Sequence, residues 1–282
     1  MNYAETDRDR LASALLALRK AAGLSTTELA RRLGCSQSKI SKTERGRTLP
    51  DADFVTEWAN ATGADADVRQ ELVSIARQAG YEAVELKRDL APGRRRKQEE
   101  IGRLESSASV VRVFAPALVV GLAQSRAYVE AVFRLGRDSG VAENLDEIVQ
   151  ERLNRQAVLD DEAKRFELLV SEFALRRQLV SEDEMRSQLK KLVELSRRSN
   201  VSFGVIPFAA DEQVHQYHGF SILGDPTIDD EALVLVTTVT RTLRIRAPTE
   251  VADYITHFDA LRSGALVDAD FRAYVEDVIA AT

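Results

Sequence analysis

The sequence predicts an all-α domain of five helices followed by a larger α/β (α+β) domain, in which helices cover a central sheet. Two observations lead to this prediction. Up to residue 80, apolar side chains recur at helical spacing. After residue 105, short apolar runs typical of strands alternate with amphipathic helical stretches. We therefore expect a first domain at 1–80, a basic linker at 81–104 and a second domain at 105–282.

The first domain has a central pair of helices and three helices around it. Leu11, Leu15 and Leu18 give the first helix an apolar face, and Pro50 and Asp51 begin the fourth helix. These outer helices close a small core around the central pair. The predicted buried side chains of the fourth and fifth helices are Phe54, Val55, Trp58, Val68, Leu72 and Ile75.

The central pair consists of Ser25–Leu33 and Gln37–Arg45, separated by a tight corner at 34–36. Ser25 is a good N-cap, and Glu28, three residues later, completes a capping box. The glycine that opens the corner suits the left-handed conformation in which helices end. The sequence therefore predicts a helix-turn-helix.

The second helix of this pair presents polar and basic side chains around a single buried residue, Ile40. Glutamine pairs with the major-groove edge of adenine, lysine pairs with guanine, and lysine and arginine also contact phosphates. A solvated helical hairpin would have a similar pattern, but here the flanking helices provide a core that holds the pair. The pattern favours a helix that lies in the major groove of DNA.

The stretch LRKAAGLSTTELARRLGCSQSKISKTERGRTLP, from Leu18 to Pro50, resembles the lambda-repressor-like helix-turn-helix family, often called the XRE family. The resemblance covers about residues 8–79. It implies sequence-specific binding to double-stranded DNA and an internal ion pair between Arg19 and Glu44. The family often has glutamine where this chain has Thr26, whose hydroxyl has a shorter reach to a phosphate. The expected DNA-binding residues are Thr26, Gln37, Ser38, Lys39, Ser41, Lys42, Arg45 and Arg47.

Positive charge is concentrated near this predicted recognition helix. The chain has a net charge of −6, but Leu24–Pro50 holds six basic and two acidic side chains. The part after residue 104 holds 20 basic and 29 acidic side chains, so it should repel DNA outside the docking surface. A small basic patch implies modest affinity per subunit. We therefore expect a homodimer on a two-part site.

The predicted linker at 81–104 loses the apolar period. Pro92–Gly93 breaks any helix there, and the basic run Arg94–Lys97 follows directly. Two interpretations of this run stay open: a solvated hinge, or a basic tether that lies along phosphates beside the helix-turn-helix.

The second domain alternates predicted strands with predicted helices, which favours a layered sheet with covered faces. The predicted strands are Val110–Phe114, Phe166–Val170, Val201–Pro207, Gly219–Leu223, Leu233–Thr237 and Leu243–Arg246. The predicted helices are Ser125–Leu135, Leu145–Leu159, Glu182–Ser199, Thr249–Arg262 and Asp268–Ala280.

Four segments of this domain carry a second resemblance: Arg103–Phe133, Phe166–Leu179, Met185–Phe208 and His218–Asp225. They are similar to a large actinobacterial group of XRE regulators that includes the WhiJ-like regulators. Members of that group are often encoded beside a small acidic protein and are also described as antitoxin-like. The resemblance implies a domain that binds a protein partner or senses a small-molecule effector.

No catalytic residue, cofactor or metal site is predicted. His218 and Asp225 have the spacing of the His-x-Lys-x4-Asp signature of phospholipase-D-like enzymes, but Phe220 replaces the lysine that would stabilise a phosphoryl oxyanion. His215, which lies in the same predicted loop, could stand at a pocket mouth. The single cysteine, Cys35, fits a small buried turn residue better than a redox switch.

The leading hypothesis is a dimeric transcriptional regulator, cytoplasmic and associated with the nucleoid when bound to DNA. The sequence has no signal-peptide core and no apolar run of membrane-spanning length. A second hypothesis is an antitoxin-like protein that neutralises a small acidic partner and autoregulates its operon. A third makes the second domain a hydrolase directed to DNA, which the missing lysine disfavours.

Overall fold

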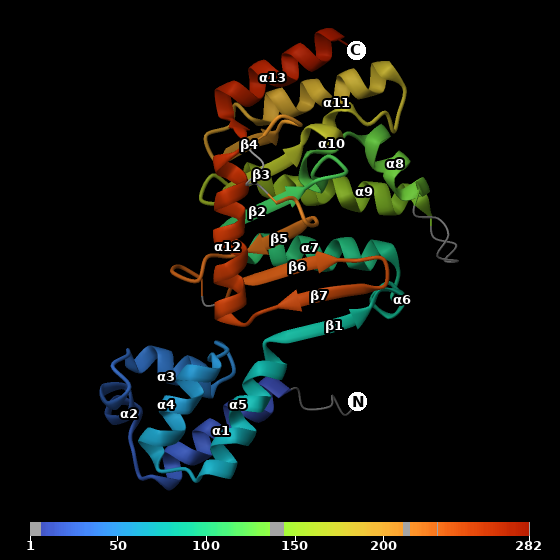
Figure 1. Ribbon diagram of the computed structural model, residues 1–282. Helices are drawn as coiled ribbons and strands as arrows, with labels where there is room; N and C mark the ends of the chain where they lie inside the picture. The colour runs from blue at the N-terminus through green and yellow to red at the C-terminus, as the bar shows by residue number, and fades with distance from the viewer. Residues whose placement is uncertain (1–6, 136–143, 211–214, 230, 282) are drawn as a thin grey trace. The chain divides into compact units, whose positions relative to one another are not determined.

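A computed structural model describes the chain except for five short stretches: 1–6, 136–143, 211–214, 230 and 282. The chain divides into two compact units (Figure 1). The first unit comprises Met1–Ala83, Pro226–Leu233 and Leu243–Asp253, and the second comprises Val84–Asp225, Val234–Thr242 and Tyr254–Thr282.

Five helices form in the part of residues 1–80 that the structure describes, which confirms the predicted all-α domain. Ser25 and Glu28 make the expected capping box, and the side chains of Ser36, Asp51 and Asp65 cap the next three helices. The helices are α1 (Asp7–Ala21), α2 (Thr26–Arg32), α3 (Gln37–Glu44), α4 (Ala52–Thr62) and α5 (Ala66–Ala79).

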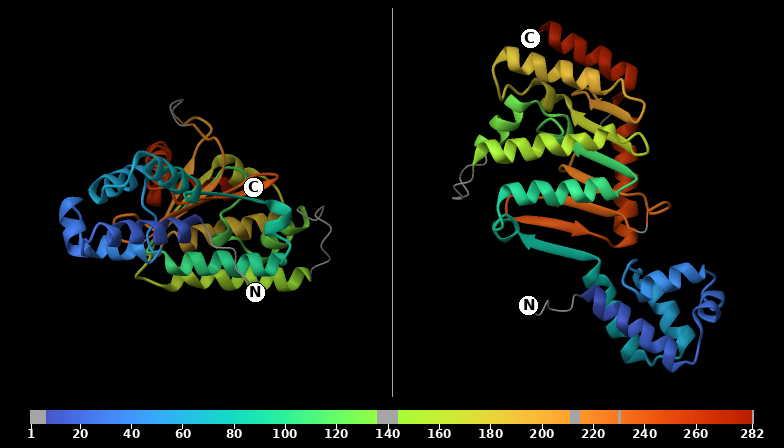
Figure 2. Two further views of the ribbon diagram at one scale, coloured as in Figure 1. Left: turned by 90° about the horizontal axis from the view of Figure 1, so that it is seen from below. Right: turned by 180° about the vertical axis from the view of Figure 1, so that it is seen from behind.

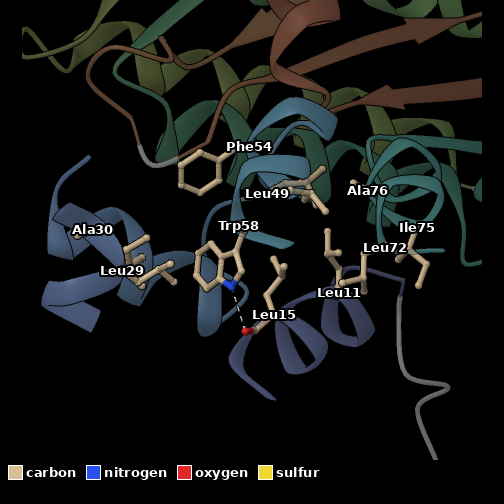
Figure 3. Close-up of a cluster of buried hydrophobic side chains, with 12 residues drawn as sticks. Leu11, Leu15, Leu29, Ala30, Leu49, Phe54, Trp58, Leu72, Ile75 and Ala76 are labelled. Carbon is tan, nitrogen blue, oxygen red and sulfur yellow. Dashed lines mark hydrogen bonds between the residues drawn. The ribbon is translucent and has the colours of Figure 1, made fainter. Parts of the chain in front are cut away.

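The core of this bundle is built around Trp58, which is fully buried (Figure 3). Its indole Nε1–H donates to the main-chain oxygen of Leu15 over 3.1 Å, so the one polar atom of the ring is satisfied. Phe54 meets the Trp58 ring edge-to-face, with centroids 6.0 Å apart. Ile40 is the fully buried anchor of α3 in the same cluster. Helix α3 is thus packed against α2 and α1, with Ile40 in the shared core.

The described residues also form one sheet of eight strands in the order β1-β7-β6-β5-β2-β3-β4-β8. All six predicted strands are present, with ends within two residues of the prediction, and β1 and β8 are additional. The strands are β1 (Tyr81–Glu85), β2 (Val110–Ala115), β3 (Arg165–Ser171), β4 (Val201–Ile206), β5 (Phe220–Leu223), β6 (Leu233–Thr237), β7 (Arg241–Ile245) and β8 (Leu266–Val267).

Strands β2, β3 and β4 are parallel, whereas β5 and β8 flank them in antiparallel orientation. The register pairs Arg112 with Glu167 across β2 and β3, and Phe114 with Phe220 across β2 and β5. The three parallel strands therefore end at one common edge, where the antiparallel β5 begins.

Helices lie on both faces of the sheet, as predicted. Figure 1 shows α12 crossing one face, and the view from behind in Figure 2 shows α7 and α9 on the opposite face. The helices are α6 (Leu86–Asp89), α7 (Arg94–Ser107), α8 (Arg126–Leu135), α9 (Leu145–Arg155), α10 (Glu172–Arg176), α11 (Glu182–Leu195), α12 (Pro248–Ser263) and α13 (Asp268–Ala281). Two short 3₁₀ turns are η1 (Gly121–Ala123) and η3 (Gln156–Asp160).

The stretch predicted as a linker, 81–104, contains β1, α6 and most of α7, so it has regular structure although its apolar period is lost. The physical reason lies in α7, whose buried residues are Gln98 and Glu105 rather than apolar side chains. Such a helix is fixed by polar pairs, and a search for apolar periodicity does not detect it. The ranges of the two predicted domains remain predictions.

Among the residues that the structure describes, none of the helices is long and apolar enough to cross a membrane.

Candidate nucleic-acid interface

The turn between α2 and α3 has the geometry that the sequence predicts. Gly34 has a φ of +62°, a left-handed conformation that side-chain-bearing residues rarely adopt. The amide of Cys35 donates to the oxygen of Ala30 over 3.0 Å and closes the end of α2. Burial raises the pKa of the half-buried Cys35 thiol, which keeps it protonated and poorly reactive at neutral pH.

The N-terminal turn of α3 is open to solvent. Gln37, Ser38 and Lys39 are exposed, whereas Ile40 and Thr43 are buried on the opposite side of the helix. The other predicted contact residues are also accessible: Arg45 and Arg47 are exposed, and Thr26, Ser41 and Lys42 are half-buried. The structure thus gathers the predicted residues on the outer side of the helix-turn-helix.

Two of these residues contact each other. The side-chain Nε2–H of Gln37 donates to the hydroxyl of Thr26 over 3.0 Å, which joins the first turns of α2 and α3. An amide nitrogen carries two hydrogens, so this bond leaves Gln37 a second N–H and its carbonyl oxygen. Both groups are needed to pair with the N7 and N6 atoms of adenine. Thr26 therefore orients the glutamine without using up its base-pairing atoms.

Lys39 contacts another side chain of the same bundle, which the sequence does not indicate. Its Nζ atom lies 4.0 Å from the centroid of the Phe54 ring, a cation–π contact between α3 and α4. No sequence signal distinguishes this position from a freely solvated lysine.

The predicted ion pair between Arg19 and Glu44 is confirmed. Arg19 donates Nε–H to Oε1 of Glu44 and Nη2–H to Oε2 over 2.9 Å, which gives a bidentate pair. Its Nη1–H also donates to the oxygen of Leu24 over 2.6 Å. The hydrogen bonds with Glu44 raise the pKa of Arg19. The pair ties the last turn of α3 to α1 and to the loop before α2, and thereby sets the orientation of the recognition helix.

Residues 10–72 match the model of a family described as a helix-turn-helix domain. Residues 98–277, more than half of the chain, match the model of a family described as Domain of unknown function (DUF5753). The chain belongs to the DUF5753 family. None of the curated proteins matches this DUF5753 protein. The helix-turn-helix match and the accessible α3 together make it a DNA-binding regulator of transcription.

His218 and Asp225, which have the spacing of the phospholipase-D-like signature, contact different residues in this DUF5753 protein. His218 lies just before β5, and its Nε2 atom is 3.2 Å from the hydroxyl of Tyr254 on α12. Asp225 follows the other end of β5. Its Oδ2 atom accepts a hydrogen bond from Nη2 of Arg112 over 3.3 Å. The group of three or more His, Cys, Asp or Glu side chains that a metal ion would need is absent from the described residues.

Proposed function

We propose that this DUF5753 protein recognises a specific duplex by placing α3 in the major groove, and that its second unit transmits a signal from a small molecule or a protein partner. The observation that carries the DNA-binding part is the exposed first turn of α3 on a helix fixed by the Arg19–Glu44 pair. A helix can read base edges only if its own position is held by the rest of the domain.

In this proposal Gln37 and Ser38 face base edges, together with Lys42 one turn later. The Thr26 hydroxyl accepts from Gln37, and we assign the same hydroxyl to a phosphate contact beside the groove. A glutamine oriented in this way loses less side-chain entropy on binding.

Arg45 and Arg47 follow the end of α3 and are both exposed. We assign them to the phosphate backbone, where arginine supplies affinity but no sequence information. The basic excess around α3 is small, so binding as a homodimer to two half-sites fits the charge distribution better than binding as a monomer.

Replacing Gln37 by alanine is expected to weaken binding to the specific site by about 1 to 3 kcal/mol, because a bidentate contact to adenine is lost. Binding to random duplex should stay nearly unchanged, since that term comes from phosphate contacts. The measurement is a competition titration with specific and random duplexes at one salt concentration.

Gln70→Ala, an exposed glutamine on α5, is the matched control and should leave both affinities unchanged. If Gln37→Ala weakened both duplexes equally, Gln37 would not be a base-reading residue and the proposed orientation of α3 would be wrong.

A further inference from the structure

All three histidines of the chain lie in one cluster of aromatic side chains on the second unit. His215 and His218 belong to the segment before β5, and His257 lies on α12. Tyr217 and Tyr254 complete the cluster. We call these five residues the imidazole–tyrosine cluster. It joins a loop to a helix that is distant in sequence.

Ring contacts hold this cluster together. Tyr217 stacks on His215 with ring centroids 5.6 Å apart and an interplanar angle of 25°. The Tyr217 ring also lies 5.5 Å from the His257 ring, at an angle of 36°. His218 contacts Tyr254 both through its Nε2 atom, at 3.2 Å from the hydroxyl, and ring to ring at 6.1 Å. The cluster therefore offers nearly parallel rings beside groups that donate and accept hydrogen bonds.

Phe220, the first residue of β5, forms the apolar base of the cluster. Its ring lies 5.9 Å from His257 and 5.1 Å from Tyr254. Because Phe220 pairs with Phe114 near the end of β2, the cluster lies at the carboxyl edge of the parallel strands. A Cβ atom on Gly219 would be 3.1 Å from Cδ of Pro116, which shows how closely the segment approaches that edge. In open α/β sheets this edge is where ligands bind.

The cluster is exposed to solvent. Tyr217 leaves 71% of its surface open to solvent, a large exposure for an aromatic side chain that already has ring partners. Among the described residues, no salt bridge joins any of the three imidazoles to a carboxylate. The acidic groups of α12 beside the cluster in sequence, Asp253 and Asp259, are exposed to water. Burial lowers the pKa of His257, and the neighbouring His218 and His215 lower it further.

We propose that the imidazole–tyrosine cluster is the binding site of a small planar aromatic acid, whose ring packs against the exposed surface of Tyr217 and whose carboxylate is held by the imidazoles. Ring surfaces favour a planar aromatic partner, and imidazole N–H groups can donate hydrogen bonds to a carboxylate. Ligand binding at this cluster does not depend on the proposed function. Only the idea that the ligand is the signal received by the second unit rests on that proposal.

The test uses the full chain without DNA, so that failure of DNA binding does not affect it. Since the cluster contains every histidine of the chain, the imidazole Cε1–H signals in NMR spectra report on the site alone. The probe is 2-naphthoate, and cyclohexanecarboxylate serves as a control with the same charge but no aromatic ring. The variants are Tyr217→Ala and, as a matched control, Phe208→Ala, an exposed aromatic residue that follows β4.

We expect saturable shifts of the histidine signals with 2-naphthoate, and binding at least about ten-fold weaker for cyclohexanecarboxylate and for Tyr217→Ala. Binding should tighten about ten-fold from pH 8 to pH 6, because a carboxylate binds the protonated form of an imidazole more tightly than the neutral form. Phe208→Ala should bind like the unchanged chain. The proposal is overturned if 2-naphthoate shifts no histidine signal at millimolar concentration, if cyclohexanecarboxylate binds equally well, or if the two variants behave alike.

Discussion

Replacing Glu44 by alanine is expected to destabilise the helical bundle by about 2 to 4 kcal/mol, because the Arg19 guanidinium then stays largely buried without its carboxylate. The side chains of Arg19 and Glu44 are only 11% and 8% exposed, so water cannot readily replace the lost partner. The change also frees the last turn of α3 from α1. We therefore expect DNA affinity to fall together with stability.

The single tryptophan makes this measurement specific to the bundle. Trp58 is the only tryptophan in the chain and lies fully buried in the bundle core, so its fluorescence in a urea titration follows the unfolding of this part. Glu71→Ala, an exposed glutamate on α5, is the matched control and should change stability by less than about 0.5 kcal/mol. An unchanged urea midpoint for Glu44→Ala would show that the pair does not stabilise the bundle.

Replacing Glu105 by alanine is expected to cost the second unit about 3 to 5 kcal/mol of stability, the largest effect that we predict. Glu105 on α7 accepts two hydrogen bonds from Arg155 on α9, over 2.9 and 2.7 Å, and the two side chains are 5% and 8% exposed. Arg152 lies one turn away, and burial followed by the charge of Arg155 lowers its pKa to about 9. Without Glu105, two buried guanidinium groups share the Gln98 amide oxygen and have no carboxylate.

Hydrogen exchange resolved by peptide in the full chain measures this effect, because it reports the protection of β2 and β3 separately from the helical bundle. Glu99→Ala on the same helix is the matched control, since Glu99 makes only a partly exposed ion pair with Arg95, worth less than about 1 kcal/mol. If Glu105→Ala and Glu99→Ala lowered the protection of β2 and β3 equally, the buried pair that joins α7 to α9 would not be what stabilises the second unit.

Much of the fold could be predicted from local signals. The caps at Ser25 and Asp51 and the glycine at position 34 act within one helical turn, so the sequence alone indicates where α2, α3 and α4 begin or end. The Arg19–Glu44 pair joins residues far apart in sequence, and only the resemblance to a known family predicted it. The position of α7 was missed because polar side chains, Gln98 and Glu105, take the place of the apolar stripe that marks most helices.

In the candidate sites, too, local features could be predicted from the sequence, whereas contacts between distant residues could not. The exposed side of α3 follows from which residues are polar, but the bond from Gln37 to Thr26 depends on how two helices cross. The imidazole–tyrosine cluster was not foreseen as a whole, although His215 and His218 were expected in a loop. Its assembly depends on the pairing of β5 with β2 and on the path of α12, which no local pattern specifies.

The central claim is that α3 reads base edges in the major groove, and modified bases test it most directly. A specific duplex is first selected from a random library with the full chain, and each purine is then replaced singly by its 7-deaza analogue, which lacks only the N7 acceptor of the major groove. We expect at least one replacement in each half-site to weaken binding about ten-fold, whereas inosine for guanine, which removes a minor-groove group, should have little effect. Selection of no preferred duplex, or a site sensitive to inosine but to none of the 7-deaza replacements, would contradict it.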